Sequence, residues 1–208
     1  PPHRTPCPDP ARTAATELNE TAAMENRRRI EGYLFLIAFG LCIPAANWLI
    51  GNVGTVCVPN GPCLIPVAPG VEAPSGVLMI GLALVLRDMV QRRLGVGWAF
   101  GAVVAGAALS AVFAPPALVM ASALAFFISE AADLAVYTPL QKRGLILAVV
   151  ASSLVGLVID SVIFLQVAFG NQDYLLGQVL GKAWMVLIAI PFVHLLRRRD
   201  EKLGIEAA

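Results

Sequence analysis

The residues of this sequence that could do chemistry are charged side chains that lie inside apolar stretches. The run from Ala117 to Arg143 is apolar enough to span a bilayer, yet Glu130 and Asp133 lie near its middle. A carboxylate at mid-membrane costs about 2.5 kcal/mol or more even on the lenient insertion scales, so such residues usually face an aqueous cavity or a partner. This placement predicts a ligand site inside the membrane.

Helical spacing brings several polar and aromatic residues of this run onto one face. Residues three or four apart follow one another along one side of a helix. The residues with that spacing are Ser122, Phe126, Ser129, Glu130, Asp133 and Tyr137. A polar stripe with an aromatic neighbour is typical of the wall of a binding site.

The other intramembrane polar residues fall into two layers when depth is counted at about 1.5 Å per helical residue. Arg87 and Asp88 are expected around the midplane with Glu130 and Asp133. The residues expected nearer the outer face are Asn47, Asp160, Ser161, Gln178 and Lys182. Each layer therefore contains charges of both signs.

Opposite charges in one layer predict ion pairs. We expect Arg87 to pair with Glu130 or Asp133, and Lys182 to pair with Asp160. Two alternatives remain open: the pairs could be purely structural, or Arg87 could extend toward the cytoplasmic surface. Because so many ionisable groups exceed what helix packing requires, the sequence favours a functional role for them.

The elements that must hold these residues are membrane-spanning helices. Of the 208 residues, 58% are hydrophobic and only 14% are charged, which is more apolar surface than a soluble domain of this length can bury. Apolar runs near the ~20 residues that cross a bilayer predict an all-α integral membrane protein with six transmembrane helices. The expected spans are residues 33–50, 76–90, 97–114, 117–143, 145–169 and 176–196.

Basic residues alternate between the loops in a way that predicts orientation. Lys and Arg cluster before the first span and after the second, fourth and sixth, and are missing from the other three loops. Because positive loops stay in the cytoplasm, we expect both termini to be cytoplasmic in a multi-pass protein of the inner (plasma) membrane.

The segments outside the spans were assigned by composition. Residues 1–23 are rich in Pro, Thr and Ala and predict a disordered extension. Met24 opens the run before the first span, so we expect the native chain to start there. Residues 24–199 form the predicted six-helix transmembrane domain, and residues 200–208 a short cytoplasmic tail. Cys57 and Cys63 lie in an outer loop at 51–75, where a disulfide is possible.

The remaining patterns argue against several function classes. The sequence has no GxSxG or HExxH motif, so we expect no catalytic residues. It has no CxxC pair or histidine cluster that would hold a metal, and we expect no cofactor. No basic face is interleaved with aromatic residues, so nucleic acid is not an expected partner.

Four stretches together carry a family resemblance. They are LRDMVQRRLG, ASALAFFISEAADLAVYTPLQKR, SSLVGLVIDSVIFLQVAFG and GQVLGKAW. With them, residues 31–196 resemble the queuosine precursor transporter family, also called the vitamin uptake transporter family. The resemblance implies a six-helix importer similar to the substrate-binding components of energy-coupling-factor transporters. Its implied substrates are 7-cyano-7-deazaguanine and 7-aminomethyl-7-deazaguanine, precursors used in tRNA modification.

The resemblance also implies roles for particular residues. One carboxylate can accept hydrogen bonds from the adjacent N–H and amino groups of a deazaguanine, and we expect Glu130 to do so. Lys182 or Gln178 would donate to the ring carbonyl, and Phe126 or a tryptophan would cover the ring. The family positions carried onto this chain are Arg87, Asp88, Ser129, Glu130, Asp133, Tyr137, Asp160, Ser161, Gln178 and Lys182.

Other partners and readings stay open at this point. The lipid bilayer surrounds the protein, and it could form a homo-oligomer or dock on an ATPase coupling module. The alternatives to a deazapurine importer are a transporter of another small vitamin or nucleobase, or a membrane subunit that binds a partner protein and transports nothing.

Overall fold

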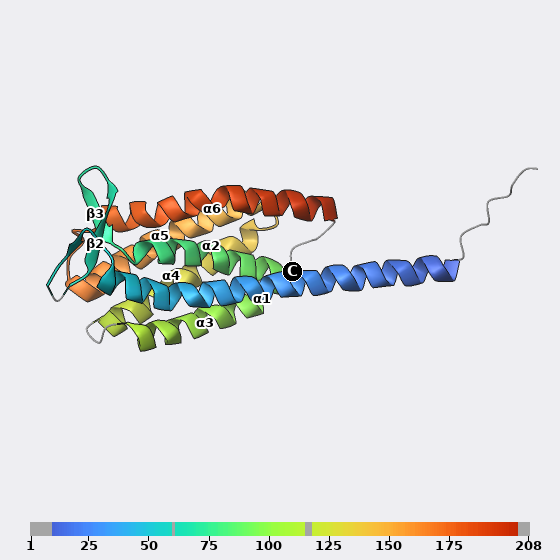
Figure 1. Cartoon of the computed structure of the whole chain (residues 1–208), viewed down its shortest axis with the longest axis horizontal. Helices are drawn as coiled ribbons and strands as arrows, with labels where there is room; N and C mark the ends of the chain where they lie inside the picture. The colour runs from blue at the N-terminus through green and yellow to red at the C-terminus, as the bar shows by residue number, and fades with distance from the viewer. Residues whose placement is uncertain (1–9, 60, 115–117, 204–208) are drawn as a thin grey trace, which may run out of the picture.

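A computed structural model describes residues 10–59, 61–114 and 118–203 as a helical bundle with a small sheet at one end (Figure 1). The long helices run side by side along the longest axis of the molecule. Their bounds are α1 Pro10–Asn52, α2 Val77–Leu94, α3 Val96–Phe113, α4 Val119–Leu140, α5 Leu145–Phe169 and α6 Leu175–Leu203. The structure is thus mostly helical, as the composition predicts.

Within the described residues, 5 helices are long and apolar enough to cross a membrane: α1 from Thr21, α3, α4, α5 and α6. Many of their large apolar side chains, such as Leu41, Val112 and Leu195, are exposed on the outside of the bundle. An apolar outer surface of this kind suits lipid rather than water. The chain is therefore a multi-pass membrane protein.

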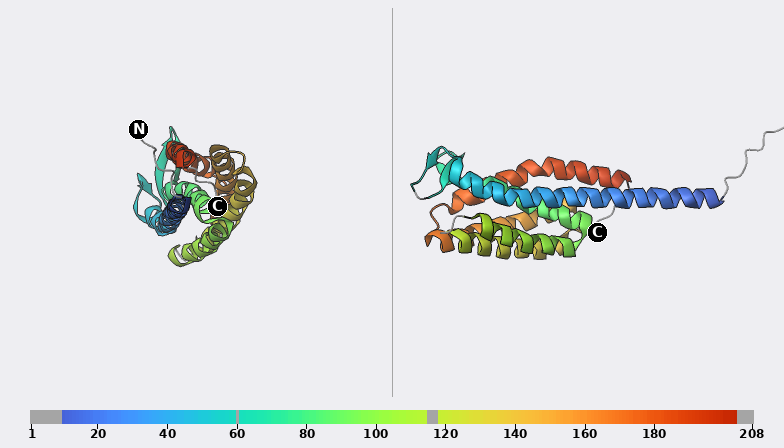
Figure 2. Two further views of the ribbon diagram at one scale, coloured as in Figure 1. Left: turned by 90° about the vertical axis from the view of Figure 1, so that its right-hand side faces the viewer. Right: turned by 60° about the horizontal axis from the view of Figure 1, so that its bottom comes forward.

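The sequence predicts α2 as a further span, but α2 does not meet that criterion of length and composition. Its 18 residues include Arg87, Asp88, Arg92 and Arg93, and all four side chains are buried. The helix contacts each of the other five helices. Figure 2 shows this bundle end-on. Protein therefore shields the charges of α2 from the surroundings of the bundle.

The α2 and α6 backbones approach closely at Gly81. A Cβ atom at this position would lie 2.6 Å from the carbonyl oxygen of Lys182, so any larger residue would push the helices apart. This contact fixes the depth of Lys182 relative to α2. Glycine is required here because of space rather than backbone conformation.

The segment expected to be an outer loop forms a three-stranded antiparallel sheet. Its strands are β1 Val56–Cys57, β2 Cys63–Ala68 and β3 Val71–Pro74, in the order β1-β2-β3. Cys57 pairs with Cys63 in the register of β1 and β2, and a disulfide joins them. The expectation of a structureless loop missed this sheet because the prolines and glycines of the segment obscure the short strands between them.

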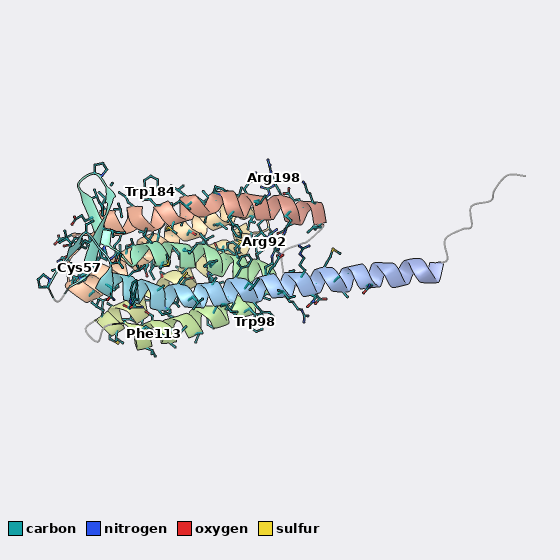
Figure 3. All side chains as sticks on the ribbon, in the orientation of Figure 1. Cys57, Arg92, Trp98, Phe113, Trp184 and Arg198 are labelled. Carbon is teal, nitrogen blue, oxygen red and sulfur yellow. A yellow bond between two sulfur atoms is a disulfide. The ribbon has the colours of Figure 1, made fainter. Side chains whose placement is uncertain are left out.

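Two side-chain hydrogen bonds attach this sheet region to the bundle. Trp184 Nε1 of α6 donates to the Val67 carbonyl of β2 at 3.0 Å. Ser75 Oγ, just after β3, donates to the Leu49 carbonyl of α1 at 2.7 Å. Figure 3 labels Cys57 at this end of the molecule and Arg198 toward the other. The sheet is thus held in place over one end of the bundle.

The structure differs from the expectation at both terminal segments. Residues 10–23, predicted to be disordered, are part of α1, which extends beyond the bundle (Figures 1 and 2). Ala and Glu in this stretch are good helix formers, and they continue a helix that is already anchored in the bundle. Residues 200–203, assigned to the tail, continue α6. Residues 1–9 and 204–208 lie outside the described part of the chain.

Arginines that the sequence suggests are loop charges form a buried ionic cluster far from the sheet. Arg92 Nε and Nη2 donate to Asp200 Oδ2 at 3.1 and 2.9 Å. Arg93 donates to both oxygens of Asp200 at 3.0 and 2.7 Å, and its Nε lies 3.1 Å from Glu31. Arg199 also donates to Glu31 at 2.6 Å. This Asp200 cluster links α1, α2 and α6.

Removing the shared acceptor should destabilise the bundle. Asp200→Asn leaves Arg92 and Arg93 without their common carboxylate, and breaking a buried ion pair costs about 3–5 kcal/mol. The matched control is Glu201→Gln, because Glu201 pairs with Arg197 at the surface and exposed pairs contribute about 1 kcal/mol or less. Thermal unfolding of the purified protein in detergent should give a clearly lower Tm for Asp200→Asn only. Equal Tm values for the two variants would contradict a stabilising role for the cluster.

The disulfide can be checked by mass. Alkylation without reductant should leave Cys57 and Cys63 unmodified, and alkylation after reduction should modify both. Peptide mapping of the unreduced protein should recover the two residues in one cross-linked species. An identical alkylation pattern with and without reductant would mean that the bond does not form.

Candidate functional site

The first buried polar cluster surrounds the guanidinium of Arg87. Its Nε donates to Glu130 Oε2 at 3.0 Å, its Nη2 donates to Asp133 Oδ1, and its Nη1 lies 2.8 Å from Asp88 Oδ1. The four side chains are at most 2% exposed. One cation thus meets three carboxylates inside the bundle. Both carboxylates that the sequence predicts as partners of Arg87, those of Glu130 and Asp133, therefore accept a hydrogen bond from it.

Neighbouring residues complete this Arg87 cluster. Ser152 of α5 donates to Asp88 Oδ2 at 3.0 Å. Gln91, one turn after Arg87, donates to Thr138 of α4 at 3.1 Å. The Tyr137 ring lies 5.9 Å from the Arg87 guanidinium carbon, within the range of a cation–π contact. Spacing of three or four residues places Arg87 and Gln91 on one face of α2, and Glu130, Asp133 and Tyr137 on one face of α4.

The second buried cluster surrounds the ammonium of Lys182. Its Nζ donates to Asp160 Oδ2 at 2.5 Å, to Ser161 Oγ at 2.8 Å and to Gln178 Oε1 at 2.7 Å. These three bonds use the full donor capacity of an ammonium group. The ion pair predicted between Lys182 and Asp160 is therefore formed, and Gln178 joins it from one turn earlier on α6.

Ser129 lies between the two clusters. Its hydroxyl is 3.1 Å from the Phe126 carbonyl and 3.5 Å from Asp160 Oδ1. Ser129 directly precedes Glu130 of the Arg87 cluster in sequence. One helix turn of α4 thus contacts both clusters.

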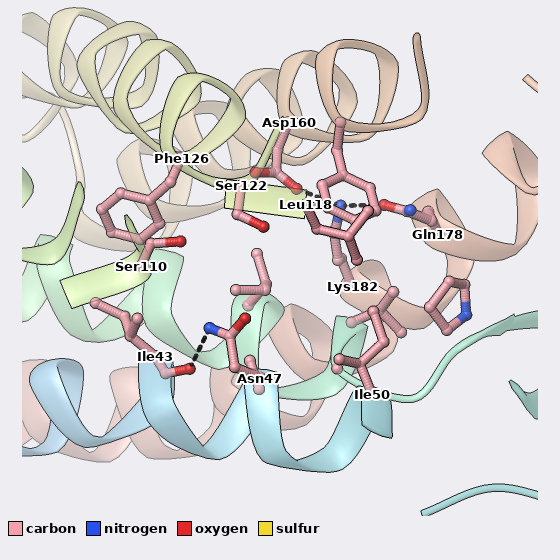
Figure 4. A pocket seen from close by; sticks show the side chains of 16 residues that line it. Ile43, Asn47, Ile50, Ser110, Leu118, Ser122, Phe126, Asp160, Gln178 and Lys182 are labelled. Carbon is pink, nitrogen blue, oxygen red and sulfur yellow. Dashed lines mark hydrogen bonds and ion pairs between the residues drawn. The ribbon is translucent and has the colours of Figure 1, made fainter. Parts of the chain in front are cut away.

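A cavity opens beside the Lys182 cluster, near the sheet end of the bundle (Figure 4). The space between its lining atoms is about 610 Å³, including the part that is open to solvent. Figure 4 shows Asp160, Lys182 and Gln178 joined by hydrogen bonds along its wall. Its lining residues are Ile43, Ala46, Asn47, Ile50, Pro74, Gly76, Val77, Ile80, Ser110, Leu118, Ser122, Phe126, Asp160, Phe164, Gln178 and Lys182.

The cavity contains only part of the residue set expected from the sequence. Five candidates line it: Asn47, Phe126, Asp160, Gln178 and Lys182. The candidates that do not line it are Arg87, Asp88, Ser129, Glu130, Asp133, Tyr137 and Ser161. The reason is pairing, because Arg87 holds the α4 carboxylates among α2, α4 and α5. Glu130, which the sequence predicts as a ligand-binding residue, accepts from Arg87 and does not line this cavity.

Three further residues bring polar or aromatic groups to the wall. Ser110 of α3 and Ser122 of α4 bring hydroxyl groups, and Phe164 of α5 brings a second ring. Helical spacing places Ser122 on the predicted polar stripe of α4, and the same spacing indicates Phe164, since it lies four residues after Asp160. Pro74 and Gly76 come from the sheet region, for which the sequence predicts no structure.

The chemistry of the cavity suits an uncharged, flat ligand with hydrogen-bonding edges. Asp160 and Lys182 balance each other, so their pair adds no net charge. Asn47 donates to the Ile43 carbonyl at 3.0 Å, which leaves its side-chain oxygen as an acceptor (Figure 4). Phe126 and Phe164 offer apolar rings. No group of acidic, cysteine or histidine residues suitable for a metal ion occurs in the described ranges.

Comparison with known proteins identifies the membrane part of the chain. Neither the curated proteins nor the solved structures include a significant match to it. Residues 76–196 match the family described as "Putative vitamin uptake transporter". The match covers more than half of the chain, from the start of α2 to Leu196 of α6, and it includes the Arg87 and Lys182 clusters. The chain therefore belongs to this family of vitamin uptake transporters.

Proposed function

We propose that this protein imports a queuosine precursor, 7-cyano-7-deazaguanine or 7-aminomethyl-7-deazaguanine, for tRNA modification. The observation that carries the proposal is the cavity whose wall combines a carboxylate, an ammonium, an amide and two phenylalanine rings. Membership in a family of vitamin uptake transporters supports uptake of a small organic solute. The sequence resemblance to queuosine precursor transporters supports the choice of a deazapurine.

The polar groups of the cavity match the edges of such a base. A deazaguanine presents an N–H and an amino group side by side, which one carboxylate can accept together. Asp160 takes this role in our proposal in place of Glu130, because Asp160 lines the cavity. The amide nitrogen of Gln178 then donates to the ring carbonyl, while Lys182 holds the Gln178 oxygen and Asp160 in place. Phe126 covers the ring. Pairing with buried polar groups would discriminate against bases that lack these edges.

We further propose that the protein lies in the inner membrane with six spans and both termini in the cytoplasm. In this arrangement α2 is an inner span that the other helices screen from lipid. The disulfide in the sheet supports an outer location for that end, since disulfides persist in oxidising compartments. The arginines at the opposite end of α2 and α6 support a cytoplasmic location there. The cavity would then receive its substrate from outside.

The leading alternative is another flat vitamin or nucleobase, since the family description does not name a base. An uptake assay distinguishes the deazapurine from these alternatives. Cells that cannot make the precursor should acquire queuosine in their tRNA when they express this protein and receive labelled 7-cyano-7-deazaguanine. Excess unlabelled guanine or a pteridine should compete weakly. No gain of queuosine over cells without the protein would reject the deazapurine.

A single substitution in the cavity should weaken that uptake. Gln178→Leu keeps the approximate size of the side chain and removes its amide, so the ligand and Lys182 each lose a hydrogen-bonding partner. A loss of about 1–3 kcal/mol predicts a rise of about 5- to 150-fold in the half-saturating substrate concentration. The matched control is Gln166→Leu, because Gln166 is exposed on α5 outside the cavity. Equal curves for the two variants would place the substrate elsewhere.

Paired substitutions should separate stability from transport at the Lys182 cluster. Asp160→Asn leaves a buried ammonium without its counter-ion, which should cost about 3–5 kcal/mol. Adding Lys182→Gln removes that uncompensated charge and should recover most of the lost Tm in detergent. Uptake should stay low in both variants, because the groups that bind the ligand are gone. A double variant that transports like the unmodified protein would make the pair purely structural.

A further inference from the structure

The Arg87 cluster carries more negative than positive charge, and the function proposed above makes no use of it. Arg87 is the one cation that contacts Asp88, Glu130 and Asp133 among the described residues. All four side chains are buried inside a bundle with an apolar outer surface. If every carboxyl group were ionised, the cluster would hold two uncompensated negative charges. Such charges are strongly unfavourable in a site of low dielectric constant.

No other charged group in contact with the cluster corrects this imbalance. From α2, Gln91 is neutral and Arg92 is bound to Asp200. From α5, Ser152 donates a neutral hydrogen bond. Asp160 of α5 lies near Glu130 and adds negative charge, but it is already neutralised by Lys182 of α6. The missing positive charge must therefore come from outside the chain.

Three polar atoms of the cluster lack a hydrogen-bond partner and mark where such a charge would bind. Asp88 Oδ1, Asp133 Oδ2 and the Tyr137 hydroxyl are buried, and none accepts or donates a hydrogen bond in the described part of the chain. Asp88 Oδ1 is nevertheless within 2.8 Å of Arg87 Nη1, whereas the other two have no such neighbour. Asp133 Oδ2 is directed toward α5, because a Cβ on Gly156 would lie 3.1 Å from it. An ionised oxygen in contact with a glycine backbone is poorly solvated, whereas a protonated oxygen is neutral. The described residues also form no group suited to a metal ion.

From this geometry we propose that the Arg87 cluster is a proton-binding site, with Asp133 as a residue that carries a proton. One proton on Asp133 lowers the excess negative charge of the cluster from two to one. An O–H bond forms on Asp133 when hydronium transfers its proton, and the bond breaks when the proton returns to water. The cluster is closed to solvent in this structure, so exchange requires α2, α4 and α5 to separate. Proton binding is thereby linked to the conformation of the bundle.

The Arg87 cluster, where the proton would bind, is connected to the cavity, where the substrate would bind. Ser129 bridges toward Asp160 of the cavity, and Glu130 follows it directly in the Arg87 cluster. A ligand that hydrogen-bonds to Asp160 would therefore change the contact between Asp160 and Ser129, on the turn of α4 that carries Glu130. Substrate import coupled to proton entry follows from this link, and this second step rests on the function proposed above.

Infrared spectroscopy tests the proton site without any substrate. The purified full-length protein at neutral pH should show the C=O stretch of a buried carboxylic acid, shifted in D₂O. Asp133→Asn should remove the contribution of one carboxylic acid from this band, since its amide resembles a protonated carboxyl group in shape. The control Asp173→Asn should keep the full band, because Asp173 is exposed in the loop before α6. Absence of the band from the unmodified protein, or an undiminished band in Asp133→Asn, would overturn the proposal.

Proteoliposomes test the coupling. With the membrane potential clamped, one proton per neutral substrate predicts about tenfold accumulation of 7-cyano-7-deazaguanine for each unit of inwardly directed pH gradient. Asp133→Asn should bring the substrate to equal concentrations inside and outside the proteoliposomes, without accumulation. Equal accumulation with and without the gradient, or accumulation that requires ATP, would overturn the coupling. If the unmodified protein takes up no substrate at all, the proposed function fails, and the infrared result still decides the proton site.

Discussion

Compensation of buried charge is the constraint on which the rest of this structure depends. A bundle with an apolar outer surface cannot leave ionised groups in contact with lipid, so each must find a partner inside the protein. Arg87, Lys182 and Arg93 all do so, with carboxylates from helices other than their own. Because breaking such a pair exposes an unpaired charge, the pairs restrict how the helices can be arranged.

This constraint explains the central position of α2. The helix contributes Arg87 to the middle of the bundle and Arg92 and Arg93 to the Asp200 end, and it contacts every other helix. A helix with these charges would be a poor span if it faced lipid. Surrounded by α1, α3, α4, α5 and α6, it becomes the element to which the others are attached. Small residues such as Gly81 make that enclosure possible.

The sequence predicts the ion pairs better than the position of the cavity. Depth along a span follows from counting residues, so charges of opposite sign in one layer could be matched, as for Lys182 with Asp160. The direction in which each helix face points depends on packing between helices, which one sequence does not reveal. Glu130 was therefore assigned to the ligand, although Arg87 holds it away from the cavity. The polar stripe of α4 was predicted, but its contact with two separate clusters was not.

Features that depend on contacts distant in sequence were also beyond prediction. Arg92 and Arg93 resemble ordinary loop charges until Asp200, more than 100 residues later, is seen to accept from both. The sheet at residues 56–74 depends on a pairing between very short strands and on the hydrogen bond from Trp184 of α6. Local patterns carry little information about either contact.

The separation of the two clusters has a physical consequence for transport. A substrate site must desolvate and release its ligand in every cycle, so its charges should be balanced when it is empty, as Asp160 and Lys182 are. A site that senses conformation can instead keep a charge imbalance, because the imbalance makes its energy sensitive to water access. The Arg87 cluster has that imbalance and the cavity does not. Ser129 connects the two sites, because its hydroxyl contacts Asp160 of the cavity and the next residue, Glu130, belongs to the Arg87 cluster.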